Sequence, residues 1–235
     1  MKPINDILKD GLQDSKKKIQ TISIDWNSHS KTIIDIALML CPKKEDDPDS
    51  GYKINENNKP ILKLLLLYFT GNKDFETYCE EITGDTGSLD KGIMLNGGVG
   101  TGKTILFEIF KHYTKYVLSV NSFQQFTCIE IIDNVNISGP AYLEQFSFRD
   151  GKPITCYFDD IASKNEVVKH YGTEMNVIEQ LLSLRYNVFQ RYGTLTHCTS
   201  NKFGKELVDL YDARVVDRLR EMFNIIELQG NSFRK

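Results

Sequence analysis

The sequence predicts an α/β fold in three layers, α/β/α, built on a mainly parallel sheet of five strands. Short apolar segments bounded by Gly, Asp or Asn alternate with segments of helical periodicity from residue 91 onward. The long connections suit helical crossovers, which parallel strands require, rather than hairpins. Strands of such a sheet are buried on both faces, which explains their nearly continuous apolar runs. A small helical region is expected to precede this core.

The spacing of apolar residues predicts the individual elements. The five candidate strands span residues 92–96, 126–132, 154–158, 194–199 and 224–228. Between the first two strands, apolar residues recur with a period of about 3.6 from Ile105 to Val117, which predicts a helix. The same period from Val177 to Phe189 predicts a second crossover helix between the third and fourth strands.

The N-terminal region differs from this core in composition. Apolar residues at helical spacing predict two modest helices, over residues 4–12 and 33–41. Residues 42–59 combine Pro, Gly, Asn and mixed charge with few apolar residues, which is typical of an exposed linker. A further helix is expected from Pro60 through Phe69. We therefore expect an N-terminal helical region with its linker at residues 1–58 and a core domain at residues 59–235.

The composition is that of a globular protein without a general affinity for nucleic acid. The chain has 235 residues, and 29 Lys+Arg against 32 Asp+Glu give a net charge of -3. No global positive field therefore draws the protein to DNA, and any such contact must be local. The candidates for it are Lys164, Lys169, Lys202 and Lys205. Scattered lysines of this kind also serve solubility alone.

The sequence also indicates the cellular compartment. The most apolar stretch, residues 61–69, is far shorter than the roughly 20 residues that a transmembrane helix requires. Residues 1–12 lack the continuous apolar core of a secretory signal. The 5 cysteines are scattered without a CxxC pair, which favours free thiols over disulfides or a zinc site. We expect a cytoplasmic protein without a membrane partner.

A glycine-rich loop between the first strand and its helix carries the clearest functional signal. It matches G-x-x-x-x-G-K-[ST] in full and comprises Gly97, Gly98, Val99, Gly100, Thr101, Gly102, Lys103 and Thr104. The glycines let successive backbone amides surround phosphate oxygens, and the helix start adds partial positive charge. Lys103 would place its charge on the β and γ phosphates, and the Thr104 hydroxyl would bind Mg²⁺. The loop therefore predicts binding of ATP with Mg²⁺.

Polar residues at the ends of two other strands supply candidates for hydrolysis. Asp159 and Asp160 follow the strand at residues 154–158, where a parallel sheet delivers side chains to its carboxyl edge. Asp159 would hold Mg²⁺, and Asp160 would orient or deprotonate the attacking water. Asn201, which follows the strand at residues 194–199, can hydrogen-bond water and the γ-phosphate without adding charge.

Several segments together resemble the AAA+ ATPases of the DnaC/IstB type, a branch of the P-loop NTPases that includes helicase loaders and transposition helper ATPases. The segments occur in the family's order and read KGIMLNGGVGTGKT, CYFDDIAS, THCTSN, ARVVDRLREMF and QGNSFRK. The resemblance covers roughly residues 60–235. Many P-loop proteins share the first segment, so the specificity of the resemblance comes mainly from the last two.

The resemblance implies a role for each matching residue. These roles are Walker A for Lys103 and Thr104, Walker B for Asp159 and Asp160, sensor 1 for Asn201, an arginine finger for Arg218, and a sensor-2-like nucleotide contact for Arg234. An arginine supplied by a neighbouring subunit makes hydrolysis depend on assembly, which implies a homo-oligomer. From the residues alone, the charges of Asp217, Arg218, Arg220 and Glu221 favour an ion-paired helix face instead.

The function that the resemblance implies is that of a helicase loader in DNA replication, which hydrolyses ATP to ADP and phosphate. Its partners would be a replicative helicase, held by residues 1–58, and single-stranded DNA. One alternative is a transposition helper ATPase whose partner is a transposase. Another is a nucleotide-gated binding module with little hydrolysis, since Asp160 is one methylene shorter than the Glu of many relatives. A small-molecule kinase is a further alternative, because kinases also join such a loop to a parallel sheet.

Overall fold

The computed structural model of the chain describes residues 26–47, 50–120, 122–163, 166–170, 172–230 and 232. The helix predicted over residues 4–12, as well as Lys164 and Arg234, lies outside these residues. The chain divides into two compact units, and we describe each by itself. In the described part, unit 1 comprises residues 90–94 and 124–224, and unit 2 comprises residues 26–89, 95–123 and 225–232.

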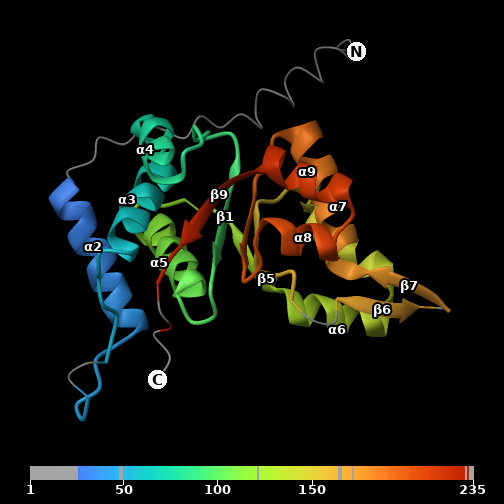
Figure 1. The fold of residues 1–235 in the computed structure, drawn as a ribbon, viewed down its shortest axis with the longest axis horizontal. Helices are drawn as coiled ribbons and strands as arrows, with labels where there is room; N and C mark the ends of the chain where they lie inside the picture. The colour runs from blue at the N-terminus through green and yellow to red at the C-terminus, as the bar shows by residue number, and fades with distance from the viewer. Residues whose placement is uncertain are drawn as a thin grey trace. The chain divides into compact units, whose positions relative to one another are not determined.

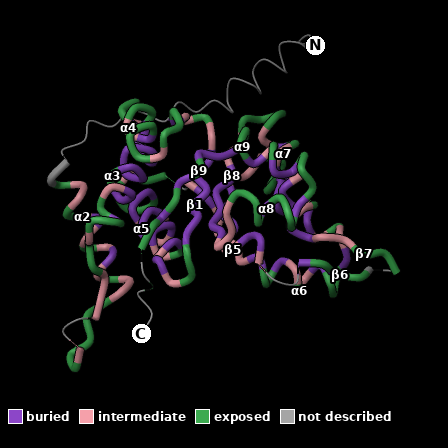
Figure 2. The backbone as a smooth tube through the Cα atoms, in the orientation of Figure 1, coloured by how far each residue is buried: buried purple, intermediate pink, exposed green. Residues whose placement is uncertain are grey.

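The main sheet has five parallel strands in the order β2-β5-β8-β1-β9. Its strands are β1 (Gly92–Gly97), β2 (Gln124–Thr127), β5 (Cys156–Ile161), β8 (Thr196–Ser200) and β9 (Phe223–Leu228). Figure 2 shows the mostly buried course of β1, β5, β8 and β9, as expected for strands covered on both faces. The predicted α/β fold with a mainly parallel five-stranded sheet is confirmed.

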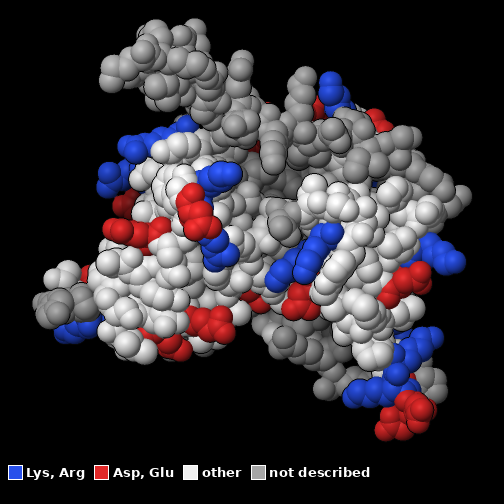
Figure 3. Space-filling model, turned by 180° about the vertical axis from the view of Figure 1, so that it is seen from behind, with Lys and Arg blue, Asp and Glu red and all other residues white. Residues whose placement is uncertain are grey.

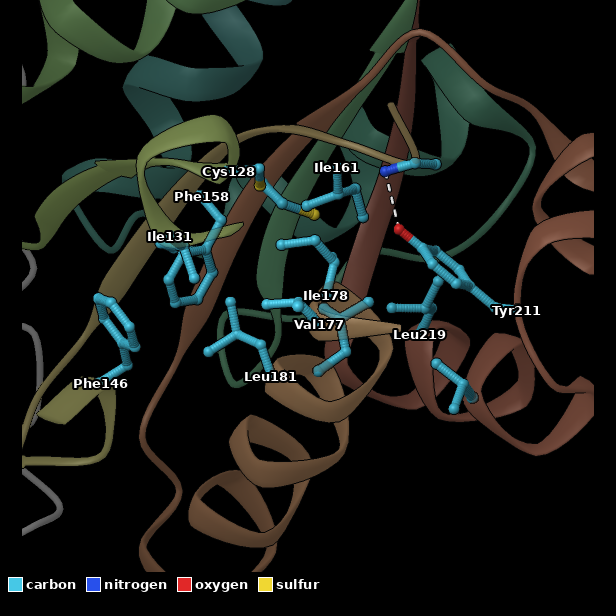
Figure 4. Close-up of a cluster of buried hydrophobic side chains, with 14 of the residues drawn as sticks. Cys128, Ile131, Phe146, Phe158, Ile161, Val177, Ile178, Leu181, Tyr211 and Leu219 are labelled. Carbon is cyan, nitrogen blue, oxygen red and sulfur yellow. Dashed lines mark hydrogen bonds between the residues drawn. The ribbon is translucent and has the colours of Figure 1, made fainter. Parts of the chain in front are cut away.

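Unit 1 surrounds its strands with helices and two small hairpins. The helices are α6 (Cys128–Ser138), α7 (Val177–Tyr192), α8 (Gly204–Leu210), α9 (Ala213–Met222) and the 3-10 helix η1 (Pro140–Phe146). The hairpins pair β3 (Phe148–Arg149) with β4 (Lys152–Pro153) and β6 (Val167–His170) with β7 (Thr173–Asn176). Figure 4 shows Phe158 of β5 facing Ile131 of α6, with Leu181 of α7 in the same buried cluster.

Unit 2 gathers four helices, α2 (Trp26–Leu40), α3 (Asn58–Phe69), α4 (Asp74–Thr83) and α5 (Lys103–Tyr116). Figure 1 shows α2 and α3 beside α5, and both contact it. The rings of Phe69 and Phe110 stack at 5.1 Å, which joins α3 to α5. The hydroxyl of Tyr113 is hydrogen-bonded to His29 at 2.5 Å, which joins α2 to α5. The domain boundary expected at residue 58 stays a prediction.

The strand predicted at residues 126–132 is wrong beyond Thr127. The strand β2 covers Gln124–Thr127, and α6 begins at Cys128. The Thr127 side chain accepts a hydrogen bond from the backbone N–H of Glu130, which is the N-cap that starts a helix. Apart from Glu130, the residues from Cys128 to Ile132 are apolar, and periodicity alone does not distinguish a short buried helix segment from a buried strand.

The cysteines and helices of the described residues can be compared with the other predictions. Four of the five cysteines are buried and all five are free, as their scattered spacing indicated. Within the described ranges, no helix combines the length and the apolar character needed to cross a bilayer. The helices expected around residues 33–41, 60–69, 105–117 and 177–189 correspond to α2, α3, α5 and α7.

Candidate functional site

The glycine-rich loop of unit 2 joins the end of β1 to the start of α5. Gly100 and Gly102 adopt positive φ angles of 82° and 94°, which are costly for residues with a side chain. A Cβ atom on Gly97 would lie 2.6 Å from the carbonyl oxygen of Leu228. The loop therefore keeps its curled course because glycine occupies these positions. Val99 stands at the exposed tip of the loop, with 63% of its surface accessible.

Lys103 turns back into this loop from the first position of α5. Its side chain is only 7% exposed, and its Nζ donates hydrogen bonds to the carbonyl oxygens of Gly97 and Gly98 at 2.8 and 2.9 Å. The hydroxyl of Thr101 donates to the same Gly98 oxygen at 2.9 Å. A buried ammonium is costly unless it is solvated by dipoles or paired with an anion. The loop thus holds a positive charge where a phosphate group would be surrounded.

The residues around the loop fit a triphosphate with its metal. The space above Gly98 is open apart from the methyl group of Thr101, 3.6 Å from the place of a Cβ. Thr104 is exposed and lies one position after Lys103, and a hydroxyl is a suitable ligand for Mg²⁺. Asn96, just before the loop, keeps a buried Oδ1 acceptor without a hydrogen-bond partner among the described residues. The cation and the glycines suit an anionic ligand, whereas the Asn96 acceptor would require a hydrogen-bond donor.

The two acids at the end of β5 belong to a hydrogen-bond network in unit 1. Asp159 Oδ1 accepts from the hydroxyls of Tyr157 at 2.6 Å and Thr199 at 2.7 Å. The Thr199 hydroxyl also accepts from the backbone N–H of Asp160 at 2.8 Å. The network fixes one carboxylate oxygen of Asp159 and joins β5 to β8 across their parallel ladder. An oriented, partly exposed carboxylate is the group that a Mg²⁺ site requires.

Asp160 has an unusual backbone conformation. Its φ angle is 62°, in the left-handed region that a residue with a side chain seldom adopts, and the register of β5 shifts between Phe158 and Ile161. The bulge turns its carboxylate toward Asn201, whose Nδ2 donates to Asp160 Oδ1 at 2.5 Å. Such strained residues concentrate at functional sites. The structure thus brings together Asp159, Asp160 and Asn201, three residues selected from the sequence.

Tyr157 and Thr199 are members of this network that sequence reasoning missed. Tyr157 lies two positions before Asp159, so the alternation of a strand places both on one face of β5. Thr199 follows Cys198, which pairs with Phe158 in the sheet register. Burial beside the Asp159 carboxylate raises the pKa of Tyr157, which therefore stays a hydroxyl donor. The period of two along β5 could have indicated Tyr157, whereas Thr199 requires the register between strands.

Arg218 of α9 lies against α7. Its guanidinium lies over the ring of Tyr186, 4.8 Å from the centroid, and donates to the Ser183 hydroxyl at 3.4 Å. Glu221 instead accepts from the Tyr186 hydroxyl at 2.8 Å. Among the described residues Arg218 makes no ion pair, so the ion-paired alternative does not apply to it. Its partly exposed guanidinium therefore remains available to an anion.

The lysines proposed to contact DNA give less support. Lys169 pairs with Glu174 at 3.7 Å and Lys202 with Glu206 at 2.7 Å, so two of the candidates have carboxylate neighbours. On the face shown in Figure 3, the described basic side chains alternate with acidic ones rather than gathering into one patch. A DNA contact by these lysines stays a prediction.

Comparison with solved structures identifies the fold of the chain. The crystal structure of DnaI matches with a TM-score of 0.50 over 75% of this chain and 88% of that chain, at 18% sequence identity. This chain has the AAA+ fold. The AAA+ structures of the DnaC helicase loader and of AMPPCP-bound DnaA from Aquifex aeolicus match at TM-scores of 0.45 and 0.44, with 17% and 16% identity. Each match covers 77% of this chain, against 95% of the DnaC chain and 48% of the DnaA chain.

No family model and no curated protein sequence matches the chain. The AAA+ fold is therefore recognised from the structure, and any role of an individual residue is a proposal argued from its local geometry. That geometry comprises the glycine-rich loop with Lys103 in unit 2 and the network of Asp159, Asp160 and Asn201 in unit 1.

Proposed function

We propose that the chain binds ATP with Mg²⁺ and hydrolyses it to ADP and phosphate. The observation that carries this proposal is the Lys103 ammonium, buried in a glycine-rich loop at the N-terminus of α5. A phosphate oxygen can replace the two carbonyl oxygens as partner of the ammonium, while the loop amides and the start of α5 add further attraction. Lys103 and residues 97–104 are thus the proposed phosphate site.

The hydrogen-bond network of Asp159, Asp160 and Asn201 supplies the proposed catalytic residues. The motif resemblance supports the proposal that this network and the glycine-rich loop act on one nucleotide. Thr104 and Asp159 would hold Mg²⁺, which when bound withdraws charge from the phosphate oxygens. Asp160 would orient the attacking water, and Asn201 would hold the Asp160 carboxylate in place.

We propose that formation of a homo-oligomer controls ATP hydrolysis. Arg218 is partly exposed, makes no ion pair with a described carboxylate and lies over the Tyr186 ring, and we propose that it contacts the γ-phosphate of a neighbouring copy. Arginine fingers of this kind raise hydrolysis by about 10³- to 10⁵-fold in GTPase systems. The active form would be a homo-oligomer in which each copy supplies Arg218 to the next. Arg234, which lies outside the described residues, stays a predicted nucleotide contact.

The proposed biological role is that of a replicative helicase loader. The match to DnaI supports the AAA+ fold, and the motif resemblance supports the role. In this proposal residues 59–235 form the ATPase core, residues 1–58 bind the helicase, and single-stranded DNA contacts the assembled protein. Nucleotide state would then govern loading or release.

A second candidate function is an ATP-gated binding module with little turnover. The observation that favours it is the short side chain of Asp160, whose Oδ1 is already hydrogen-bonded to Asn201 and whose backbone is fixed by Thr199. In this candidate function, the shorter and already hydrogen-bonded Asp160 carboxylate activates the attacking water less effectively than a Glu carboxylate would. The two candidates share nucleotide binding and differ in the rate of phosphate release.

Phosphate release measured against protein concentration tests the proposal. We expect the rate per chain to rise with concentration for the wild type and to stay low at every concentration for Arg218→Ala. Mixing Arg218→Ala with Lys103→Ala should restore turnover, because an intact loop on one copy then meets an intact arginine on the next. A rate per chain that is equal in wild type and Arg218→Ala at all concentrations would exclude the shared site. Tight ATP binding without phosphate release would establish the second candidate.

A further inference from the structure

The backbone that follows Asp160 is strained at a second position. Ala162 has a φ angle of 59°, so it lies, like Asp160 at 62°, in the left-handed region that residues with a side chain seldom adopt. Such conformations persist only where surrounding contacts hold them. Ile161 between them is buried. The orientation of the Asp160 carboxylate therefore depends on the contacts that hold the segment 160–163 of unit 1.

Two contacts from β8 hold the first half of this segment. The backbone N–H of Asp160 donates to the Thr199 hydroxyl at 2.8 Å, and the Ser200 hydroxyl donates to the carbonyl oxygen of Ile161 at 3.1 Å. Because β8 is the neighbour of β5 in the sheet, strand register sets both contacts. Both precede Ala162, so the strained conformation of that residue needs support from elsewhere.

Tyr211 and Glu166 hold the second half of the segment. The Tyr211 hydroxyl accepts from the backbone N–H of Ala162 at 2.7 Å, as drawn in Figure 4, and donates to Glu166 Oε2 at 2.9 Å. Glu166 Oε1 accepts from the backbone N–H of Ser163 at 3.0 Å. Tyr211 is itself fixed at the end of α8, where its backbone N–H donates to the carbonyl oxygen of Leu207 at 2.9 Å. The two side chains thus link α8 to the strained segment.

This pair places polar groups inside the apolar core of unit 1. Tyr211 belongs to the cluster of buried side chains in Figure 4, and Glu166 is only 4% exposed. Burial of polar groups is costly unless they are hydrogen-bonded, and apolar side chains of similar volume often stabilise a core at least as well. The distinct contribution of the pair is therefore the orientation of the segment 160–163, which apolar side chains could not provide.

We propose that Glu166 and Tyr211 are positioning residues for ATP hydrolysis, which hold the segment 160–163 so that the Asp160 carboxylate faces the attacking water. Neither side chain needs to touch the nucleotide, since both act through the backbone between Ala162 and Asp160. A misplacement of about 1 Å can cost about 10²-fold in rate. The inference rests on the proposed function, in which Asp160 orients the water. Nucleotide binding should not depend on the pair.

The kinetics of Tyr211→Phe and Glu166→Leu test this inference from both sides of the pair. Tyr211→Phe keeps the ring in the core and removes the hydroxyl, whereas Glu166→Leu removes both carboxyl acceptors. In each folded variant kcat should fall at least about tenfold, while the affinity for ATP with Mg²⁺, measured by calorimetry, stays within about twofold of the wild type. Tyr192→Phe, which removes the hydroxyl of an exposed tyrosine on α7, is the matched control and should change neither quantity.

A glycine at position 162 distinguishes positioning from a general loss of structure. Glycine adopts a φ angle near 59° without steric cost, so the segment can keep its course without the Tyr211 hydroxyl. The kcat of Tyr211→Phe/Ala162→Gly should therefore exceed that of Tyr211→Phe at least about threefold. If a destabilised core caused the loss, the more flexible glycine would lower the rate further.

The outcomes separate this inference from the proposed function. The inference is overturned if kcat of the folded single variants stays within about twofold of the wild type, or if kcat and ATP affinity fall together. Failure of glycine at position 162 to restore the rate would overturn it as well, with hydrolysis by the wild type intact. If the folded wild type binds no ATP, or binds it without releasing phosphate, hydrolysis itself fails and no positioning role remains.

Discussion

The hydroxyl of Thr199 donates to Asp159 Oδ1 at 2.7 Å, and this contact ties the end of β8 to the carboxylate that would hold Mg²⁺. Groups that orient a metal ligand typically contribute about 10- to 100-fold in metal affinity or activity. We therefore expect Thr199→Val to raise the Mg²⁺ concentration for half-maximal ATPase by about 10- to 100-fold. Thr199→Ser keeps the hydroxyl and should stay near wild type. A Mg²⁺ requirement that is unchanged in Thr199→Val would contradict this role.

Tyr186 offers a test of how Arg218 is positioned. The guanidinium lies over its ring at 4.8 Å, a contact worth about 0.5–1 kcal/mol at exposed sites. Tyr186→Leu should lower the concentration-dependent ATPase rate several-fold, whereas ATP affinity measured at low protein concentration should stay unchanged. Tyr186→Phe keeps the ring and loses the hydroxyl that bonds Glu221, so it should retain most of the rate. Equal rates in the Leu and Phe variants would show that the ring does not matter.

Glu166 gives the fold of unit 1 a pH dependence. The side chain is 4% exposed, and burial raises its pKa from 4.5 to about 7, although Tyr211 and the backbone N–H of Ser163 donate to it. Tyr211 in turn accepts from the backbone N–H of Ala162, the dashed line in Figure 4. A raised pKa in the folded state contributes stability that is present below pH 4.5 and lost as the pH rises through about 7.

Glu166→Gln should remove this dependence, because the amide carries no charge at any pH. Relative to wild type, the free energy of unfolding of Glu166→Gln should increase as the pH is raised from about 5 to 8. Urea unfolding at several pH values, followed by circular dichroism, measures the difference. A constant difference over this range would mean that Glu166 does not titrate with the fold.

Arg185 carries a charge into the core of unit 1. It is fully buried, and its guanidinium donates to Thr196 Oγ1, to the carbonyl oxygen of Phe146 and to that of Leu195 at 2.9, 2.6 and 2.9 Å. Arg185→Met would remove the guanidinium donors from these acceptors, at about 1–3 kcal/mol for each buried acceptor left unsatisfied. We expect the free energy of unfolding to fall by about 3 kcal/mol. Arg191→Met, an exposed arginine on the same helix, should change it by less than about 0.5 kcal/mol.

The spacing of apolar residues predicted most of the architecture, because buried helices and buried strands each require a characteristic pattern of apolar side chains. The strands near residues 92, 154, 194 and 224 were found because buried parallel strands are apolar throughout. The helix α6 was partly mistaken for a strand, since only the Thr127 cap separates it from β2. The hairpins β3-β4 and β6-β7 are too short to show alternation.

The parts of the candidate site that lie within one continuous segment could be predicted from the sequence. The loop around Lys103 and the acids at the end of β5 could be read from consecutive residues, because their chemistry depends on neighbours in sequence. Thr199 and Arg185 could not, since their partners lie on other elements and depend on strand register and helix packing.

Titration of the folded protein with ATP and Mg²⁺, beside Lys103→Ala, tests the central claim most directly. We predict saturable uptake of about one nucleotide per chain by the wild type, and at least about a hundredfold weaker uptake by the variant, because the buried ammonium is its main charged partner. Equal uptake by both proteins, or none by well-folded wild type at millimolar ATP, would contradict a phosphate site in the glycine-rich loop.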